Sequence, residues 1–240
     1  KLGVKILKKN NKYIVYGNGL ASFRKPNNNL LYAGNSGTLA RMIIALIATH
    51  PNQKIKVYGD HSLNKRDMKR IIKPLSKIGC IFYPKDKTNL PITIEGTDLP
   101  LAQKHVENLG SAQVKSAILL AALNTPGITT IEEKKISRDH TENILTAIKA
   151  NIKVKKLKKG NRILLKGQKK LTNFNIEIPG DPSSAAPFII LTLLTAGAEL
   201  VIKNVNCNPT RIGFIKILKK MNGNIKIKNL KKKSGEFLGN

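Results

Sequence analysis

Hydrophobic and polar positions along the chain follow one order three times: an apolar strand, a polar loop, an arginine and then a helix with one apolar face. The arginines of the three copies are Arg66, Arg138 and Arg211, which lie 72 and 73 residues apart (66 to 138 and 138 to 211). A repeat of about 70 residues is longer than the roughly 20–50 residues of a solenoid unit. Each copy is therefore predicted to be a small α/β subdomain.

A second feature repeats with the same spacing, because a glycine and small polar residues precede an apolar stretch at Gly34, Gly110 and Gly180. Apolar residues that recur every three to four positions predict helices, and alternating apolar residues predict strands. The predicted helices span residues 38–48, the Arg66 loop to about 77, 112–123, 140–150 and 185–198. The predicted strands span residues 4–7, 13–16, 55–58, 80–83, 91–95, 128–132, 152–157, 162–166 and 174–178, and residues 24–31 are predicted to form a loop.

The Pro-Gly pair at residues 179–180 is the predicted domain boundary. Residues 1–179 are expected to form one nearly complete domain, and residues 180–240 the first unit of a second domain. The opening residues 1–6 parallel residues 77–82, where a glycine ends a predicted helix. We therefore expect the chain to begin inside a unit and the whole protein to start earlier.

The remaining composition limits the class of protein. The apolar run 185–198 is shorter than the ~20 residues of a membrane span, so it predicts a buried helix. Cys80 and Cys207 have no CxxC or Cys/His spacing, which predicts neither a disulfide framework nor a zinc site. A reducing cytoplasm is the expected compartment. Four histidines lack metal-ligand spacing and are expected at the surface: His50, His61, His105 and His140.

The net charge of +29 raises the question of nucleic-acid binding. Most of the 43 basic residues are lysines that accompany many Asn and Ile residues, a bias typical of AT-rich codons. The densest basic segments, residues 153–159 and 231–233, are not interleaved with the aromatic residues that stack on single-stranded bases. We therefore expect solvated lysine faces and no specific nucleic-acid partner, with a basic binding module as an alternative.

Candidate chemistry lies at the predicted helix starts. The sequence Gly-Asn-Ser-Gly-Thr at 34–38, with Arg41 one turn later, offers backbone N–H groups and small side chains that could hold an anion. Ser111-Ala112-Gln113 with Lys115 repeats the arrangement. The alternatives are simple helix caps at both places, with Lys115 in solvent. The third start, Asp181-Pro182, carries no cation and is predicted to be a structural cap.

The repeated arginines are harder to explain structurally. A cation at a helix N-terminus is unfavourable by roughly 0.3–1 kcal/mol, so its repetition in Arg66 and Arg138 beside small polar groups predicts carboxylate or phosphate recognition. Arg211 shares the position but is expected in the other domain. Ser137 could cap the helix after Arg138, and Asp139 with Glu142 has the spacing of a capping box.

Taken in order, these segments resemble the motif series of the 5-enolpyruvylshikimate-3-phosphate (EPSP) synthase family. The resemblance covers about residues 30–225. Its motifs are Asn35-Ser36-Gly37-Thr38 with Arg41, Gly59-Asp60-His61-Ser62-Leu63 with Arg66, Ser111-Ala112-Gln113, Ser137-Arg138-Asp139-His140-Thr141-Glu142, Pro179-Gly180-Asp181 with Ser183-Ser184, and Asn208-Pro209-Thr210-Arg211.

The resemblance implies an α/β fold of repeated βαβαββ units, the inside-out α/β barrel of the enolpyruvyl transferases. It implies transfer of the enolpyruvyl group from phosphoenolpyruvate to the 5-hydroxyl of shikimate 3-phosphate, a step of aromatic amino acid biosynthesis, in a monomer without metal or organic cofactor. The implied shikimate 3-phosphate contacts are Ser111, Ala112, Gln113, Ser137 and Arg138. The implied phosphoenolpyruvate contacts are Asn35, Gly37, Arg66 and Gln113, supported by Thr38, Arg41 and Lys115.

The chain also departs from that family. Asp67 stands where the family has proline after the loop arginine, and the family's N-terminal Lys-Ser…Arg segment and later acidic and basic residues have no counterpart. No catalytic acid or base can be named, so we expect this fragment to bind shikimate 3-phosphate weakly and to be inactive alone. The sister transferase acting on UDP-N-acetylglucosamine is an alternative, although its Cys-bearing loop has no match at Cys80.

Overall fold

The computed structural model describes residues 1–51 and 54–240, which divide into two compact units. Unit 1 consists of Lys1–Ile136 and Ala150–Leu171, and unit 2 of Ser137–Lys149 and Thr172–Asn240. The segment Ser137–Lys149 thus leaves unit 1 and returns to it at Ala150. The predicted domain boundary at residues 179–180 stays a prediction.

The first part of unit 1 holds a hairpin and a four-stranded sheet in the order β3-β4-β6-β5. β3 pairs parallel with β4, and the other two pairs are antiparallel. The elements are β1 (Lys5–Lys9), β2 (Lys12–Tyr16), β3 (Leu30–Tyr32), α1 (Gly37–Ala48), β4 (Lys54–Tyr58), α2 (His61–Asn64), α3 (Lys69–Ile78), β5 (Ile81–Tyr83) and β6 (Ile92–Glu95).

A second sheet of unit 1 repeats this topology in the order β7-β8-β10-β9, again with the first pair parallel. Its elements are β7 (Lys104–Glu107), α4 (Ala112–Leu123), β8 (Ile128–Glu133), β9 (Asn151–Lys156) and β10 (Asn161–Lys166). With α5 (His140–Ala147) between β8 and β9, both copies read βαβαββ along the chain. The expected repeat is confirmed.

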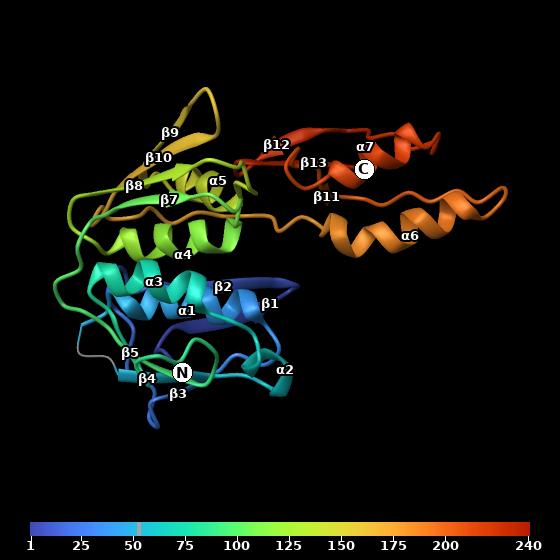
Figure 1. The fold of residues 1–240 in the computed structure, drawn as a ribbon. Helices are drawn as coiled ribbons and strands as arrows, with labels where there is room; N and C mark the ends of the chain where they lie inside the picture. Colours follow the sequence, from blue (N-terminus) through green and yellow to red (C-terminus); the bar gives the residue numbers. More distant parts are fainter. Residues whose placement is uncertain (52–53) are drawn as a thin grey trace. The chain divides into compact units, whose positions relative to one another are not determined.

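The core of unit 1 lies among its helices, which pack between the two sheets (Figure 1). Ala40, Ala45 and Ala48 of α1 are fully buried, and their small side chains allow close approach to α4. α4 is apolar on nearly all sides and buries Leu119 and Ala121 completely. Helices inside and sheets outside are the arrangement implied by the inside-out barrel.

Unit 2 contains the third copy of the repeat, with a sheet in the order β11-β13-β12. Its further elements are α6 (Pro182–Leu194), β11 (Val205–Asn206), α7 (Gly213–Lys220), β12 (Lys231–Lys233) and β13 (Glu236–Gly239). The predicted strand at 174–178 was wrong, because these residues form no strand. A single parallel bridge from Gly180 to Val205 stands in its place.

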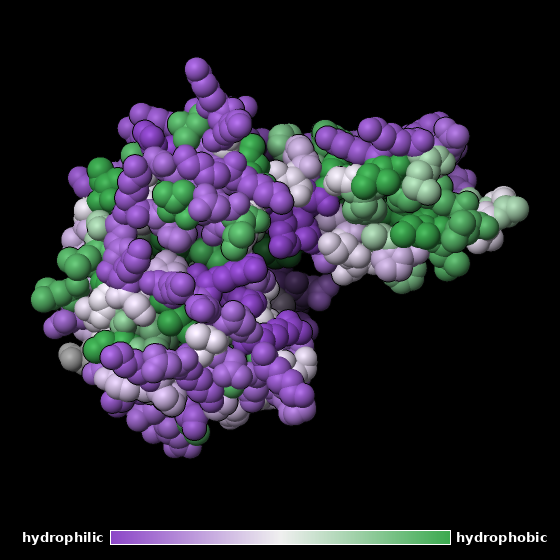
Figure 2. All heavy atoms as spheres, in the orientation of Figure 1, coloured by the Kyte–Doolittle hydropathy of each residue, from purple (hydrophilic) through white to green (hydrophobic). Residues whose placement is uncertain are grey.

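Helix α6 forms as predicted but is not buried. Asp181 caps it and Pro182 occupies its first turn, yet unit 2 buries only Pro182 and Ala185 of its residues. Phe188 is 61% exposed and Leu194 is 80% exposed, and the helix forms an apolar surface in Figure 2. The apolar pattern identified the helix correctly, but it carries no information about what covers it.

Several elements also differ from the sequence prediction, and α5 and α6 end at residues 147 and 194 where 150 and 198 were predicted. The loop expected at 24–31 ends in strand β3, and the strand β7 had no prediction. The Arg66 helix is split into the short α2 and α3, so Arg66 lies in the turn between them. None of the helices in the described ranges is both long and apolar enough to cross a bilayer.

Candidate anion-binding site

The start of α1 brings two guanidinium groups to one glycine. Ser36 caps the helix, accepting a hydrogen bond from the Leu39 backbone N–H at 3.1 Å. Of the possible caps Asn35, Ser36 and Thr38, the structure uses Ser36. Gly37 follows and is buried. A Cβ at this position would lie 2.8 Å from Nη1 of Arg41 and 3.2 Å from Nη1 of Arg66. The absent side chain therefore leaves room for the two cations to converge beside free helix N–H groups.

Arg41 is held by neutral acceptors. Its Nη1 donates to Oε1 of Gln113 at 2.9 Å, and its Nη2 donates to the backbone carbonyl of Asp67 at 3.3 Å. Partial burial lowers the pKa of Arg41, and the positive charges of Arg66 and Arg70 lower it further, against the carboxylate of Asp67. The site thus concentrates positive charge, which a bound anion would relieve.

Gln113 joins the starts of α1 and α4. Its Oε1 accepts from Arg41, and its Nε2 donates to Oγ1 of Thr38 at 2.8 Å. Ser111 caps α4 by accepting from the Val114 backbone N–H at 3.4 Å, and Ala112 is the first residue of that helix. The two helix starts that sequence singled out separately are therefore bonded to each other.

Arg66 belongs to an exposed chain of hydrogen bonds. Its Nη2 donates to Oδ1 of Asn35 at 3.2 Å, and Asn35 donates to Oδ2 of Asp60 at 2.6 Å. The other oxygen of Asp60 accepts from the Leu63 backbone N–H and caps α2. That bond, followed by the one from Asn35, holds the pKa of Asp60 below its usual value.

Asp67, which stands where the family has proline, forms a hydrogen bond at the start of α3. Its carboxylate accepts from the Lys69 backbone N–H at 2.8 Å, at the start of α3. A carboxylate at a helix N-terminus is electrostatically favourable. Asp67 therefore stabilises α3 directly after the Arg66 turn.

Lys115 was expected either in solvent or in support of the anion site. Solvent exposure was wrong, because its side chain is 0% exposed and its Nζ lies 2.9 Å from Oε1 of the equally buried Glu133. Lys115 is buried because the neighbouring residues of α4 are apolar and pack in the core. A lysine fully buried against a glutamate is not available as an exposed cation, and removing only one partner of such a pair is strongly destabilising.

The second arginine segment lies in unit 2. Arg138 is exposed and Ser137 is buried, immediately before the N-cap Asp139 of α5. The predicted capping box was wrong, because the Asp139 side chain makes no cap hydrogen bond. Its Oδ1 instead accepts from Nδ2 of Asn208 at 2.6 Å.

Arg211 has a structural role at the start of α6. It forms an ion pair with Asp181, so the cap of α6 does have a cation beside it, contributed by the later motif. Three of the four histidines also differ from the expected surface positions, because His50 is buried, and His105 and His140 are partly buried beside Glu107 and Glu236. Within the described ranges, no group of three or more His, Cys, Asp and Glu residues is arranged to hold a metal ion.

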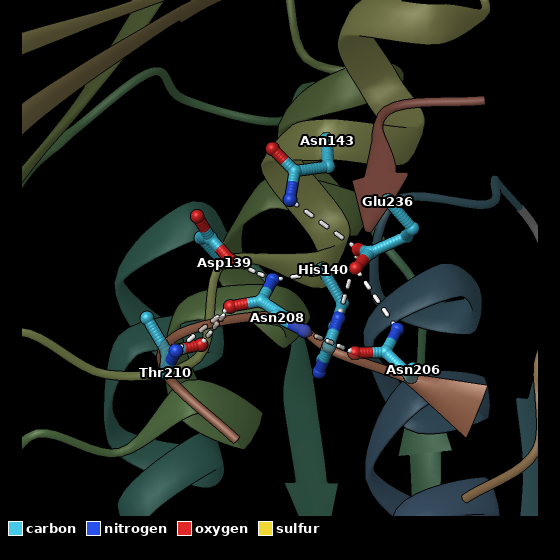
Figure 3. Close-up of polar contacts among 7 residues, drawn as sticks. All are labelled: Asp139, His140, Asn143, Asn206, Asn208, Thr210 and Glu236. Atoms are coloured by element: carbon cyan, nitrogen blue, oxygen red, sulfur yellow. Dashed lines mark hydrogen bonds and ion pairs between the residues drawn. The ribbon is translucent and has the colours of Figure 1, made fainter. Parts of the chain in front are cut away.

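Glu236 is the centre of a polar cluster in unit 2 that sequence reasoning missed (Figure 3). Its Oε1 accepts from His140 Nδ1 at 2.8 Å and from Asn143 at 3.3 Å. Its Oε2 accepts from Asn206 at 3.0 Å and from Asn208 at 3.3 Å. Of the four residues that donate to Glu236, only Asn208 and His140 belong to the quoted motifs, and a lone glutamate after a lysine run carries no signal.

The carboxylate of Glu236 makes unit 2 sensitive to acid. Burial alone raises the pKa of Glu236, but hydrogen bonds from His140, Asn206 and Asn208 outweigh it and hold the pKa below the ordinary value of about 4.3. A lowered pKa means that the stabilisation is complete above that ordinary value and is lost as the pH falls through the folded-state pKa. We expect the free energy of unfolding of unit 2, measured with urea, to fall as the pH drops below about 4.3. Glu236→Gln is expected to make this fall smaller. The exposed Glu199→Gln is the control, and an equal decline in both variants would contradict the prediction.

Comparison with known proteins decides the family. The profile of EPSP synthase (3-phosphoshikimate 1-carboxyvinyltransferase) matches residues 1–236. The chain belongs to the EPSP synthase family. The 3-phosphoshikimate 1-carboxyvinyltransferases of Sulfurihydrogenibium sp. and Parvibaculum lavamentivorans are 43% and 40% identical over 99% and 92% of this chain.

The solved structures agree. EPSP synthase from Acinetobacter baumannii superposes with a TM-score of 0.85 at 37% identity over 99% of this chain. The chain spans about half the length of these EPSP synthase family members, 55% and 49% of the two relatives and 53% of the solved chain. Family and fold are therefore shown over nearly the whole chain.

Proposed function

We propose that this chain supplies anion-binding groups for enolpyruvyl transfer from phosphoenolpyruvate to shikimate 3-phosphate. The observation that carries the proposal is the convergence of Arg41 and Arg66 on Gly37, with Gln113 bonded across to the same helix start. Two arginines and free helix N–H groups suit a substrate that carries both a phosphate and a carboxylate. Membership of the EPSP synthase family supports this choice of reaction.

The residues divide between the two substrates. For phosphoenolpyruvate the proposed contacts are Gly37, Arg66 and Gln113 with Asn35, and Thr38 and Arg41 position them. For shikimate 3-phosphate the contacts proposed in unit 1 are Ser111, Ala112 and Gln113. Those proposed in unit 2 are Ser137 and Arg138. Exposed Asn35, Arg66 and Arg138 would be accessible to ligands.

In this reaction the chain's own groups would bind and orient charge. Guanidinium groups that hold the phosphoenolpyruvate phosphate and carboxylate stabilise the negative charge of the departing phosphate. Holding two substrates together converts a bimolecular reaction into one between neighbours. Proton transfer to the methylene carbon needs an acid that no residue identified in this chain supplies.

The alternatives fit the structure less well. Cys80 is buried after α3, and its burial raises the pKa of the thiol, which does not suit the reactive cysteine loop of the UDP-N-acetylglucosamine enzyme. Lys104, Lys134 and Arg162 share the single carboxylate of Glu132, which offsets one of their three positive charges. No arrangement of basic and aromatic side chains in the described residues favours a nucleic-acid interface.

Thermal denaturation of the 240-residue chain with increasing shikimate 3-phosphate tests the proposal. A ligand that binds the folded state raises the melting temperature as its concentration passes Kd. We expect stabilisation of the wild type, much less for Arg138→Ala, and a wild-type response for Lys216→Ala, which removes an exposed charge of the same unit. Equal responses from all three proteins would contradict the role of Arg138.

A further inference from the structure

The start of α5 is anchored on both sides of its first turn by the cluster around Glu236 (Figure 3). Asp139 and His140, the two residues that follow Arg138, are both held. Asp139 accepts from Asn208 at 2.6 Å, and His140 donates to Glu236 at 2.8 Å. The backbone that carries Arg138 is therefore fixed by residues from β13 and from the loop after β11.

The anchoring residues are themselves rigidly placed. Asn208 is 2% exposed and Glu236 is 6% exposed. The Asn208 side-chain oxygen accepts from the backbone N–H and hydroxyl of Thr210, at 2.9 and 2.7 Å, while its amide donates to both Asp139 and Glu236. Its own backbone N–H donates to Asn206 at 2.9 Å. These hydrogen bonds fix the side-chain conformation of Asn208.

The approach of β13 to α5 depends on one glycine. Gly235 has a φ of +85°, and a Cβ there would lie 2.8 Å from the backbone carbonyl oxygen of Asn143. Such a contact would push the turn away from the helix. The glycine lets Glu236 reach His140 and Asn143 together.

We propose that Glu236 and Asn208 are positioning residues that hold Arg138 in place for the phosphate of shikimate 3-phosphate. This inference rests on the proposed function of Arg138. The anion site of unit 1 uses neither the Asn-Pro-Thr-Arg motif nor the Asp-His pair after Arg138. The cluster around Glu236 explains why both are present. Arg138 is exposed, and within the described ranges its guanidinium forms no ion pair, so the anchored backbone beside it limits where the guanidinium can lie.

The physical effect is preorganisation. An arginine on a mobile segment loses backbone and side-chain freedom when it binds a phosphate, and that loss weakens binding. A segment that is already fixed avoids the backbone part of this cost. Glu236→Gln replaces one of two acceptor oxygens with a donor, so four hydrogen bonds can no longer all form.

A double-mutant cycle tests the proposal by calorimetric titration of shikimate 3-phosphate into the full 240-residue chain. We expect Glu236→Gln to weaken binding about tenfold in the wild type and to have little further effect in the Arg138→Ala background. Glu199→Gln, the same charge change at an exposed site of unit 2, is expected to bind like wild type. Circular dichroism at the titration temperature establishes that each variant is folded.

If Glu236→Gln does not fold, His140→Phe is the replacement, because it removes only the shortest of the four bonds and keeps an aromatic ring. Equal losses from Glu236→Gln in both backgrounds would show a merely structural role and overturn the positioning. An unchanged affinity in folded Glu236→Gln, with Arg138→Ala weakened, would overturn the positioning alone. An unchanged affinity in Arg138→Ala would overturn the proposed function of Arg138 and the positioning with it.

Discussion

Lys115→Ala is expected to lower the free energy of unfolding by about 3–5 kcal/mol, the largest stability effect of any substitution considered. The lysine is fully buried, and its removal leaves the buried carboxylate of Glu133 without this partner. It also leaves a cavity at the start of α4, which adds to the loss. Urea unfolding followed by circular dichroism measures the change.

The exposed Lys73→Ala on α3 is the matched control and is expected to shift stability by less than about 0.5 kcal/mol. Lys115→Met combined with Glu133→Gln removes both charges, so it is expected to cost less than the sum of the two single substitutions. A loss below about 1 kcal/mol for Lys115→Ala would contradict the buried pair.

Arg66→Ala is expected to weaken the binding of phosphoenolpyruvate by about 10- to 100-fold, the largest ligand effect predicted for unit 1. Hydrogen bonds to a charged group contribute about 1.5–3 kcal/mol, and Arg66 is one of two guanidinium groups beside Gly37. Its loss also frees Asn35, the neighbour that accepts its hydrogen bond.

Competition between phosphoenolpyruvate and inorganic phosphate, measured by calorimetry, checks the prediction. Lys65→Ala removes an adjacent exposed positive charge and controls for nonspecific attraction of anions. Equal weakening by Lys65→Ala and Arg66→Ala would show that only the net charge matters, and the specific site at Gly37 would be contradicted.

Most of the helices and strands could be predicted from the sequence, because the spacing of apolar residues within a short window determines them. Helices α1, α4 and α6, the hairpins and the repeated order of elements all follow from residues within one window. Burial could not be predicted in the same way. Both α4 and α6 are apolar almost all round, yet α4 is buried and α6 is exposed in unit 2, because burial depends on whether segments distant in sequence pack against a helix.

The candidate site shows the same division. The caps Ser36 and Ser111 follow from local sequence and were confirmed. The bond from Gln113 to Arg41 joins residues 72 positions apart, and Glu236 lies 96 positions from His140. Such pairs arise when separate copies of the repeat fold, and neither residue alone signals them.

The central claim is that these 240 residues bind shikimate 3-phosphate with Arg138 as a contact, and direct calorimetric titration at physiological salt tests it. We expect one saturable site per chain, with no comparable binding of a single-stranded oligonucleotide at the same salt, because nonspecific attraction weakens as salt rises. No heat of binding from a folded chain, or binding that Arg138→Ala leaves unchanged, would contradict the account.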